Sequence, residues 1–179
     1  MRGFRSRKPV EEVLTWIDAE VSALGEETVS LQEAHGRVLA GPILSSIDVP
    51  AFDRSAMDGF ALKAEETVGA GDYNPLPFSV IGVSMPGRSF DGDLGNGQAV
   101  RIMTGAPIPV GADAVVPAEF ATEKDGTVEI VDAVPTLKHI GRTGEDVQSG
   151  SMLLEAGHRL RPQDCGLIAS IGQAEVSVI

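Results

Sequence analysis

Short runs rich in β-branched residues fill the middle of the chain, and turn-forming residues interrupt them at close intervals. Such runs, bounded by Gly, Pro, Asn or Asp, are typical of β-strands. Between Gly36 and Glu145 we predict six strands, at residues 37–44, 60–63, 77–83, 98–103, 114–119 and 127–131. Six strands within about a hundred residues indicate a barrel or sandwich-like β domain rather than a helical bundle. The 21 glycines and 11 prolines among 179 residues agree with many tight turns.

The clearest hairpin is predicted at Asp125-Gly126. An Asp-Gly pair readily adopts the positive φ angles that a two-residue hairpin turn requires. We expect this turn to join the run 114–116 to the run 127–131.

The first part of the chain has a helical pattern. Apolar residues recur every three or four positions over residues 9–24, which predicts an amphipathic helix. We expect the apolar face of this helix, including Val13, to be buried. A second, short helix is predicted at 31–35, with Ser30 as its N-cap.

The last part of the chain returns to a helical pattern. Pro162 suits a first helical turn, Gly172 suits a helix end, and Cys165 lies on the apolar face between them. An alternating pattern over 174–179 then predicts a strand with no turn or cap after it. We interpret this strand as the approach to a further domain of a longer protein; a C-terminal edge strand is the alternative.

These patterns predict an α+β fold in two parts. A β-rich domain at residues 45–144 is inserted into a discontinuous helical and β support domain, formed by 1–44 and 145–179. Insertions of this kind are tolerated when the ends of the inserted segment lie close together.

The charge balance narrows the choice of partners. Fourteen basic side chains against 26 acidic ones give a net charge of −12, which argues against nucleic acid or an anionic membrane surface as a partner. No apolar run approaches the roughly 18 residues that span a bilayer, and the basic start lacks the apolar segment of a signal peptide. Cys165 is the only cysteine and cannot form an internal disulfide, so we expect a cytoplasmic protein.

Several common catalytic and metal-binding patterns do not occur in the sequence. It has no phosphate-binding Walker loop, no nucleophile elbow and no paired-cysteine metal signature. The sequence has three histidines, which lie far apart and do not have the spacing of metal ligands. We therefore expect structural or surface roles for His35, His139 and His158.

Three polar, turn-forming segments remain as candidates, at residues 50–60, 101–109 and 141–146. Each places acidic or hydroxyl side chains beside a glycine, which lets the backbone approach a ligand closely. Carboxylates can hold a metal ion, and arginines can neutralise an oxyanion. From composition alone, ordinary turns and solvated loops explain the same segments.

A family resemblance rests on three stretches: FDRSAMDGFA at 52–61, VRIMTGAPIPVGADAVV at 100–116 and GEDV at 144–147. Together they closely resemble the N-terminal half of the molybdopterin molybdenumtransferases, the MoeA and gephyrin E-domain family. The likeness runs over residues 9–179. It implies a support domain interrupted by a β domain, followed in the family by a pterin-binding α/β domain and a small barrel that this chain lacks.

The resemblance also implies an activity. Members of the family insert molybdate into adenylylated molybdopterin, with Mg²⁺ and release of AMP. They work as homodimers, in which the active-site cleft lies between the α/β domain of one subunit and the β domain of the other. This chain is then expected to contribute one wall of that cleft and to be inactive alone.

Matching positions in the family motifs imply the site residues. Asp58, Thr104 and Asp146 are the implied catalytic residues, and Asp58, Glu145 and Asp146 are the implied metal-binding residues. The chemistry suits these residue types, because cleaving a phosphoanhydride beside molybdate crowds negative charges that carboxylate-bound Mg²⁺ can neutralise. Thr104 is expected to donate to a phosphate or molybdate oxygen.

Arginines in the same motifs are expected to offset the acidic background locally. Arg101 and Arg142 are the implied cofactor-binding residues. Arg54 is the weakest of these candidates, because relatives tolerate other residues at its position.

Two other functions stay open. The main alternative is a non-catalytic dimerisation or scaffold module of the gephyrin type. The other alternative is a stand-alone β domain that binds a metal or an oxyanion. On this hypothesis, the chain alone should bind molybdate or Mg²⁺ tightly.

Overall fold

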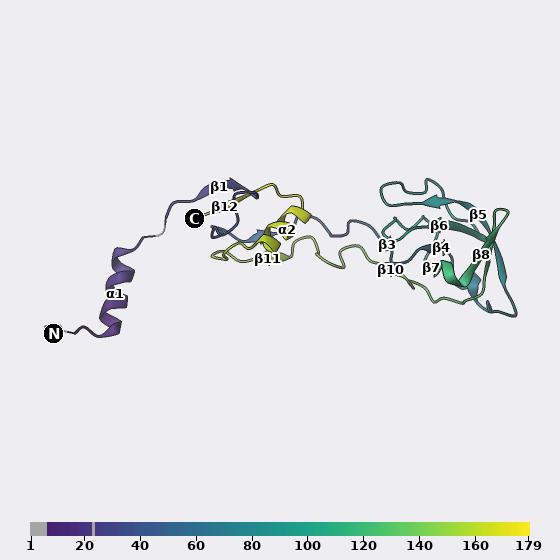
Figure 1. Ribbon diagram of the computed structural model, residues 1–179, viewed down its shortest axis with the longest axis horizontal. Helices are drawn as coiled ribbons and strands as arrows, with labels where there is room; N and C mark the ends of the chain where they lie inside the picture. The colour runs from purple at the N-terminus through teal and green to yellow at the C-terminus, as the bar shows by residue number, and fades with distance from the viewer. Residues whose placement is uncertain (1–6, 23) are drawn as a thin grey trace, which may run out of the picture. The chain divides into compact units, whose positions relative to one another are not determined.

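The computed structural model describes residues 7–22 and 24–179, and the chain divides into two units (Figure 1). The support unit comprises residues 1–44 and 152–179, and the β unit comprises residues 45–151. The segment 145–151, which the sequence placed in the support domain, groups with the β unit. It does so because its backbone pairs there, with the Val49 amide donating to the Val147 carbonyl at 2.8 Å.

A six-stranded mixed sheet forms most of the β unit, in the order β7-β4-β6-β5-β9-β8 (Figure 1). Strands β5 and β6 pair in parallel, and the other neighbours pair antiparallel. The strands are β4 (Gly59–Leu62), β5 (Leu76–Ser84), β6 (Gln98–Ile102), β7 (Ala114–Pro117), β8 (Ala121–Lys124) and β9 (Thr127–Ile130). Two 3-10 helices, η1 (Ala64–Thr67) and η2 (Ala118–Phe120), lie in the connections.

Strand β4 is buried along its whole length and separates two apolar cores. Phe60 and Leu62 pack in one core, and Ala61 packs in the other, because successive side chains of a strand point to opposite faces. A Cβ at Gly59 would lie 2.0 Å from the carbonyl oxygen of Val116. Glycine is therefore required where β4 meets β7.

The predicted hairpin turn is confirmed, but its predicted first strand is wrong. Asp125 and Gly126 both have positive φ, 49° and 78°, as a two-residue turn requires. Strand β8 precedes this turn and pairs with β9, whereas β7 lies beside β4 at the opposite edge of the sheet. The sequence of β8, Ala-Thr-Glu-Lys, is polar and mostly exposed, so no apolar alternation marks it.

The other strand predictions differ in accuracy. The predicted strands at 60–63, 77–83, 98–103 and 127–131 are confirmed as β4, β5, β6 and β9. The run at 114–119 ends early, because η2 follows Pro117. Within the run at 37–44 the regular strand is only β2 (Ile43–Leu44), with isolated bridges at Val38 and Leu39.

The described residues of the support unit form two helices, α1 (Val10–Glu20) and α2 (Pro162–Ser170), and two short strand pairs. Strand β1 (Glu27–Ser30) pairs with β12 (Glu175–Val178), and β2 pairs with β11 (Met152–Leu154). Helix α2 (Pro162–Ser170) is confirmed as predicted, with Gly172 at φ 82° just after it. The strand predicted at 174–179 is also confirmed, and its partner is β1.

The short helix predicted at 31–35 is wrong, because this segment forms turns after β1. Ser30 ends β1, and the Glu33 amide donates to the Ser30 carbonyl at 3.0 Å in a turn. The Ser30 hydroxyl bonds the Glu33 carboxylate at 2.8 Å. Ser30, the predicted N-cap, therefore stabilises a turn instead.

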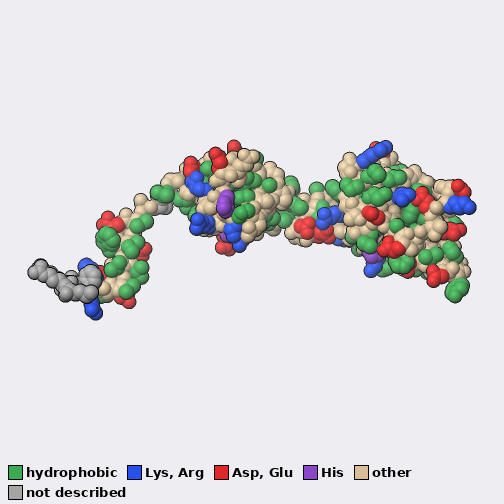
Figure 2. Space-filling view, viewed as in Figure 1, with side chains coloured by type: hydrophobic (Ala, Val, Ile, Leu, Met, Phe, Trp, Pro, Cys, Tyr) green, Lys and Arg blue, Asp and Glu red, His purple; other side chains and the backbone are tan. Residues whose placement is uncertain are grey.

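Helix α1 (Val10–Glu20) has the predicted apolar face, but none of its residues is buried. The helix ends earlier than predicted because Val21 is already extended, with φ −93° and ψ 119°. Val13 and Ile17 each remain 40% exposed, and Figure 2 shows apolar side chains on the surface of α1. The expectation that this face is buried is wrong for the described residues.

We expect two leucines of the support unit to differ sharply in their contribution to stability. Leu160 is 1% exposed, so Leu160→Ala should lower the free energy of unfolding by about 2–5 kcal/mol through the lost contacts and the cavity. Leu44 is 50% exposed, so Leu44→Ala should cost less than about 1 kcal/mol. Urea denaturation of both variants measures this, and equal losses would contradict the assigned core.

Candidate functional site

A hollow of about 400 Å³ in the β unit brings the three polar segments together. Strand β3 (Arg54–Ser55) pairs with β10 (Ile140–Gly141), which joins the first segment to the third. The hollow is lined by Arg54, Ser55, Ala56, Thr104, Gly105, His139, Ile140, Gly141 and Glu145. Residues far apart in the sequence therefore share one polar surface.

Asp58 and Thr104 form a close polar pair beside this hollow. Asp58 Oδ1 accepts a hydrogen bond from the Thr104 amide at 2.7 Å and another from the Thr104 hydroxyl at 2.7 Å. The pairing of β4 with β6 sets Gly59 opposite Ile102, so the ends of the two strands place these residues together. We call this arrangement the Asp58–Thr104 clamp.

The clamp controls the charge of Asp58. The Thr104 amide and then the Thr104 hydroxyl hold the pKa of the Asp58 carboxyl below its usual range. Asp58 is therefore a carboxylate at neutral pH. The Thr104 hydroxyl proton is directed at Asp58, which differs from the expectation that Thr104 donates to a ligand oxygen.

A second clamp, between Asp53 and Thr143, was not predicted from the sequence. Asp53 Oδ1 accepts hydrogen bonds from the Thr143 amide and hydroxyl, both at 2.8 Å. These two bonds, followed by the charge of Arg142, lower the pKa of the Asp53 carboxyl. We call this arrangement the Asp53–Thr143 clamp.

A shared sequence signal accompanies both clamps. Each threonine stands directly before a glycine with positive φ, 82° at Gly105 and 71° at Gly144. A positive φ turns the chain sharply after the threonine. The recurrence of Thr-Gly in two of the three candidate segments could have identified the second clamp.

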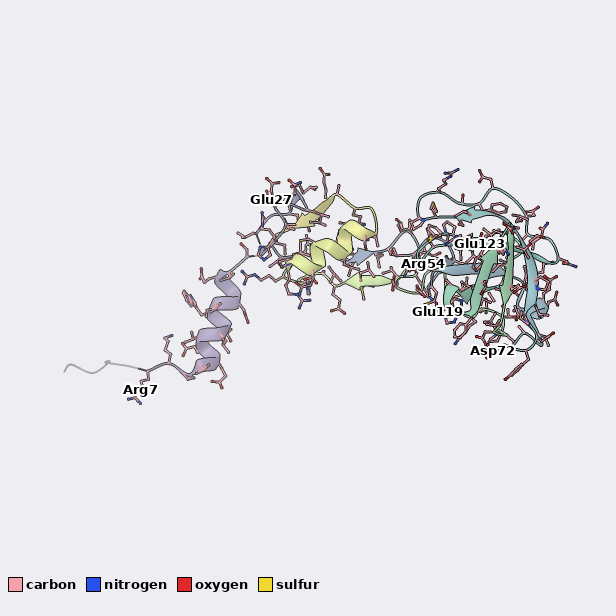
Figure 3. All side chains as sticks on the ribbon, turned by 45° about the vertical axis from the view of Figure 1, so that its right-hand side comes forward. Arg7, Glu27, Arg54, Asp72, Glu119 and Glu123 are labelled. Atoms are coloured by element: carbon pink, nitrogen blue, oxygen red, sulfur yellow. The ribbon has the colours of Figure 1, made fainter. Side chains whose placement is uncertain are left out.

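An ion pair with Arg54 holds Glu145 in place. Arg54 is labelled in Figure 3. Glu145 Oε1 accepts from Arg54 Nη2 at 2.8 Å, and Oε2 accepts from the Arg142 amide at 3.1 Å. The Arg54 bond is the main reason that the pKa of Glu145 is lowered. Asp146 lies 3.4 Å from the same Arg54 nitrogen and is more exposed.

The carboxylates do not form a magnesium site by themselves. Among the described residues, no three side chains of His, Cys, Asp or Glu are grouped so that they could hold a metal ion. Both oxygens of Glu145 are already hydrogen-bonded, and one oxygen of Asp58 is occupied by its clamp. The expected set of Asp58, Glu145 and Asp146 is therefore not assembled within this unit.

Arg101 lies apart from the other candidates. Its guanidinium donates to Glu123 of β8 at 2.9 Å, and the two side chains line a different hollow. Arg142, in contrast, is next to the Asp53–Thr143 clamp and belongs to the third polar segment.

Comparison with known proteins identifies close relatives over nearly the whole chain. Residues 8–172 match the family described as the MoeA N-terminal region (domain I and II). The molybdopterin molybdenumtransferase of Bacillus subtilis is 42% identical over 180 residues, covering 98% of this chain and 42% of the relative. Molybdopterin molybdenumtransferase 2 of Mycobacterium tuberculosis H37Rv is 42% identical over 152 residues, covering 85% of this chain and 38% of the relative.

A solved structure shows the same fold. The molybdopterin biosynthesis moeA protein from Pyrococcus horikoshii OT3 superposes with a TM-score of 0.88 at 36% identity, over 95% of this chain and 45% of that chain. The predicted α+β fold is confirmed by this match. The chain spans less than half the length of these relatives.

We expect the Thr104 hydroxyl to set part of the acidity of Asp58. Thr104→Val keeps the shape of the side chain but removes the hydroxyl donor, so the pKa of Asp58 should rise toward its usual value. Thr104→Ser keeps the hydroxyl, so the pKa of Asp58 should stay lowered. Thr143→Val should raise the pKa of Asp53 and leave that of Asp58 unchanged. Carboxyl carbon NMR titrations measure both groups; an unchanged Asp58 in Thr104→Val would contradict the assignment.

Proposed function

Because this chain belongs to the MoeA family of molybdopterin molybdenumtransferases, we propose that it supplies one wall of the site that inserts molybdate into adenylylated molybdopterin. The observation that carries the proposal is the Asp58–Thr104 clamp at a polar hollow of about 400 Å³. The rest of the site lies on parts of the relatives that this chain does not span. The chain alone is then inactive.

Asp58 acts in this proposal as a fixed negative charge. Its lowered pKa makes it a weak proton acceptor at neutral pH, so it does not store a proton. A carboxylate held in one orientation instead aligns a water molecule or a protonated group of the substrate. Thr104 keeps the carboxylate in place and offers its oxygen lone pairs to the same ligand.

A chain of net charge −12 repels an anionic substrate, so positive charge near the hollow is needed to bind one. Arg142 is the proposed cofactor-binding residue of this wall. Arg54 is neutralised by Glu145 and Asp146, so it mainly fixes the loop that carries Asp146, the third proposed catalytic residue. Arg101 is not part of this wall, since it pairs with Glu123 in another hollow.

The Mg²⁺ that the resemblance implies does not fit the carboxylates of this unit as a resident ion. The proposed roles of Asp58, Thr104 and Arg142 do not depend on it. A cytoplasmic location, expected from the single cysteine, completes the proposal.

A chimera tests the function directly. This chain replaces the matching N-terminal part of the Bacillus subtilis relative, to which it is 42% identical. The chimera should insert molybdate into adenylylated molybdopterin, and the chain alone should not. A folded chimera without activity, beside an active parent, would contradict the proposed function.

Asp58→Asn in the chimera should lower molybdate insertion by about a hundredfold or more. Asn keeps an oxygen that can accept both Thr104 bonds and removes only the charge, so folding should be unaffected. Asp125→Asn is the matched control, because it changes another exposed Asp-Gly turn and should leave activity unchanged. If a folded Asp58→Asn variant inserts molybdate at nearly the rate of the unaltered chimera, Asp58 has only a structural role in its turn.

The support unit is the proposed site of homodimerisation. Helix α1 exposes Val13, Trp16 and Ile17 on its apolar face, and exposed apolar faces of this kind often mark protein interfaces. The scaffold function that the gephyrin resemblance implies would use the same association.

Light scattering should therefore give the mass of a dimer at high micromolar concentration. Trp16→Glu places a charge on the exposed face, where Trp16 is 63% accessible, and should shift the mass toward the monomer without unfolding it. A monomer mass for the unaltered chain would contradict the dimer proposal.

A further inference from the structure

The Asn96-Gly97 turn has no role in the proposed function and lies directly before strand β6. Both residues are exposed, and Gly97 has φ 66°. We propose that Asn96 is a modification site, at which the chain converts its own asparagine to aspartate and isoaspartate with the help of Lys63 and Glu66. This modification is independent of the proposed function.

Asn96 is the only asparagine of the chain that can react in this way. The nucleophile of the reaction is the backbone nitrogen of the following residue. Asn74 is the only other asparagine, and it precedes Pro75, whose nitrogen carries no hydrogen. Gly97 follows Asn96, and the lack of a side chain lets its nitrogen approach the Asn96 amide closely. Asn74 is therefore an internal control for Asn96.

The reaction closes a ring between Asn96 and Gly97. The Gly97 nitrogen attacks Asn96 Cγ, a C–N bond forms, and the Gly97 amide proton passes to Glu66. The bond between Cγ and the side-chain nitrogen of Asn96 breaks, and this nitrogen takes the proton from Glu66 and leaves as ammonia. Water then opens the cyclic imide at one of its two carbonyl groups, which gives aspartate or isoaspartate. No oxidant or reductant takes part.

Two charged side chains already contact the reacting groups. Lys63 Nζ donates to Asn96 Oδ1 at 2.5 Å, and the Gly97 amide donates to Glu66 Oε2 at 2.9 Å. The Lys63 charge stabilises the negative charge that develops on Oδ1 when Cγ is attacked. The Glu66 carboxylate lies where it can accept the amide proton. The electrophile and the nucleophile are thus each bound by the group that the reaction needs.

The fold holds both sides of these contacts in place. The two charged side chains come from η1 and from the residue directly before it. The Ala64 amide donates to Asp113 Oδ1 at 2.7 Å, and the buried Thr67 hydroxyl donates to the Ala64 carbonyl at 2.8 Å. On the other side, the Gly97 carbonyl accepts a hydrogen bond from the Ser79 amide at 2.9 Å. Both η1 and the turn are therefore tied to the rest of the β unit.

Two substitutions distinguish promotion of the reaction from simple restraint of the turn. Glu66→Gln keeps an oxygen that can accept the Gly97 hydrogen bond but removes the carboxylate that takes up the proton. Lys63→Met keeps most of the length of the side chain and removes its charge. Each variant should deamidate about tenfold more slowly than the unaltered chain, or more slowly still. If the contacts only restrained the turn, each variant would deamidate at least as fast.

Incubation of the purified 179-residue chain at neutral and mildly alkaline pH tests the modification. Peptide mass spectrometry should show the amide of Asn96 converted to an acid, with Asn74 unchanged. An isoaspartyl methyltransferase should methylate the same peptide. Glu65→Gln removes the charge of an exposed glutamate in the same 3-10 helix, so this matched control should deamidate at the rate of the unaltered chain. Circular dichroism checks that each variant is folded.

Three results would overturn the modification site. These are no conversion of Asn96, an unchanged or faster conversion in either Glu66→Gln or Lys63→Met, and an equal slowing in Glu65→Gln, which would indicate an effect of net charge only. None of them bears on molybdate insertion, which the chimera measures independently.

Discussion

The candidate site depends on one kind of interaction, an aspartate that accepts two hydrogen bonds from one threonine. Hydrogen bonds to a charged group are roughly twice as strong as those between neutral groups. Asp53 and Asp58 make this contact at the two ends of one short segment, each with a different loop. Strand β3 lies between the two aspartates in the sequence and lines the hollow, so the clamps fix both ends of the segment that forms this part of the polar surface.

Local charge pairing then decides which groups remain available to a ligand. Arg54 and Glu145 satisfy each other, and the Arg142 amide caps the second oxygen of Glu145. Asp58 keeps one oxygen outside its clamp, and the Arg142 side chain belongs to no ion pair of the described residues. This polar surface therefore offers a fixed anion and a cation rather than a group of free carboxylates, which is why the described residues do not form a metal site alone.

The sequence predicted much of the fold because apolar alternation reports burial on a sheet. It succeeded for β4, β5, β6 and β9 and failed for β8, whose polar side chains face solvent. The apolar face of α1 was predicted correctly, but amphipathicity does not say what covers a face, and nothing in the described residues buries this one. Asp58 and Thr104 were singled out through family motifs, whereas their contact depends on the register of β4 against β6. Asp53 was missed because its partner, Thr143, lies far along the chain, and only the recurring Thr-Gly pair links the two clamps in the sequence.

Amide hydrogen exchange at Thr104 and Thr143 tests most directly whether the clamps organise the site. Both amides donate to carboxylates, so each should exchange much more slowly than the exposed amides of the loops around it. Asp58→Ala should release Thr104 and leave Thr143 protected, because each clamp is a separate contact. Exchange of both amides at the rate of an unstructured loop in the unaltered chain would contradict the account.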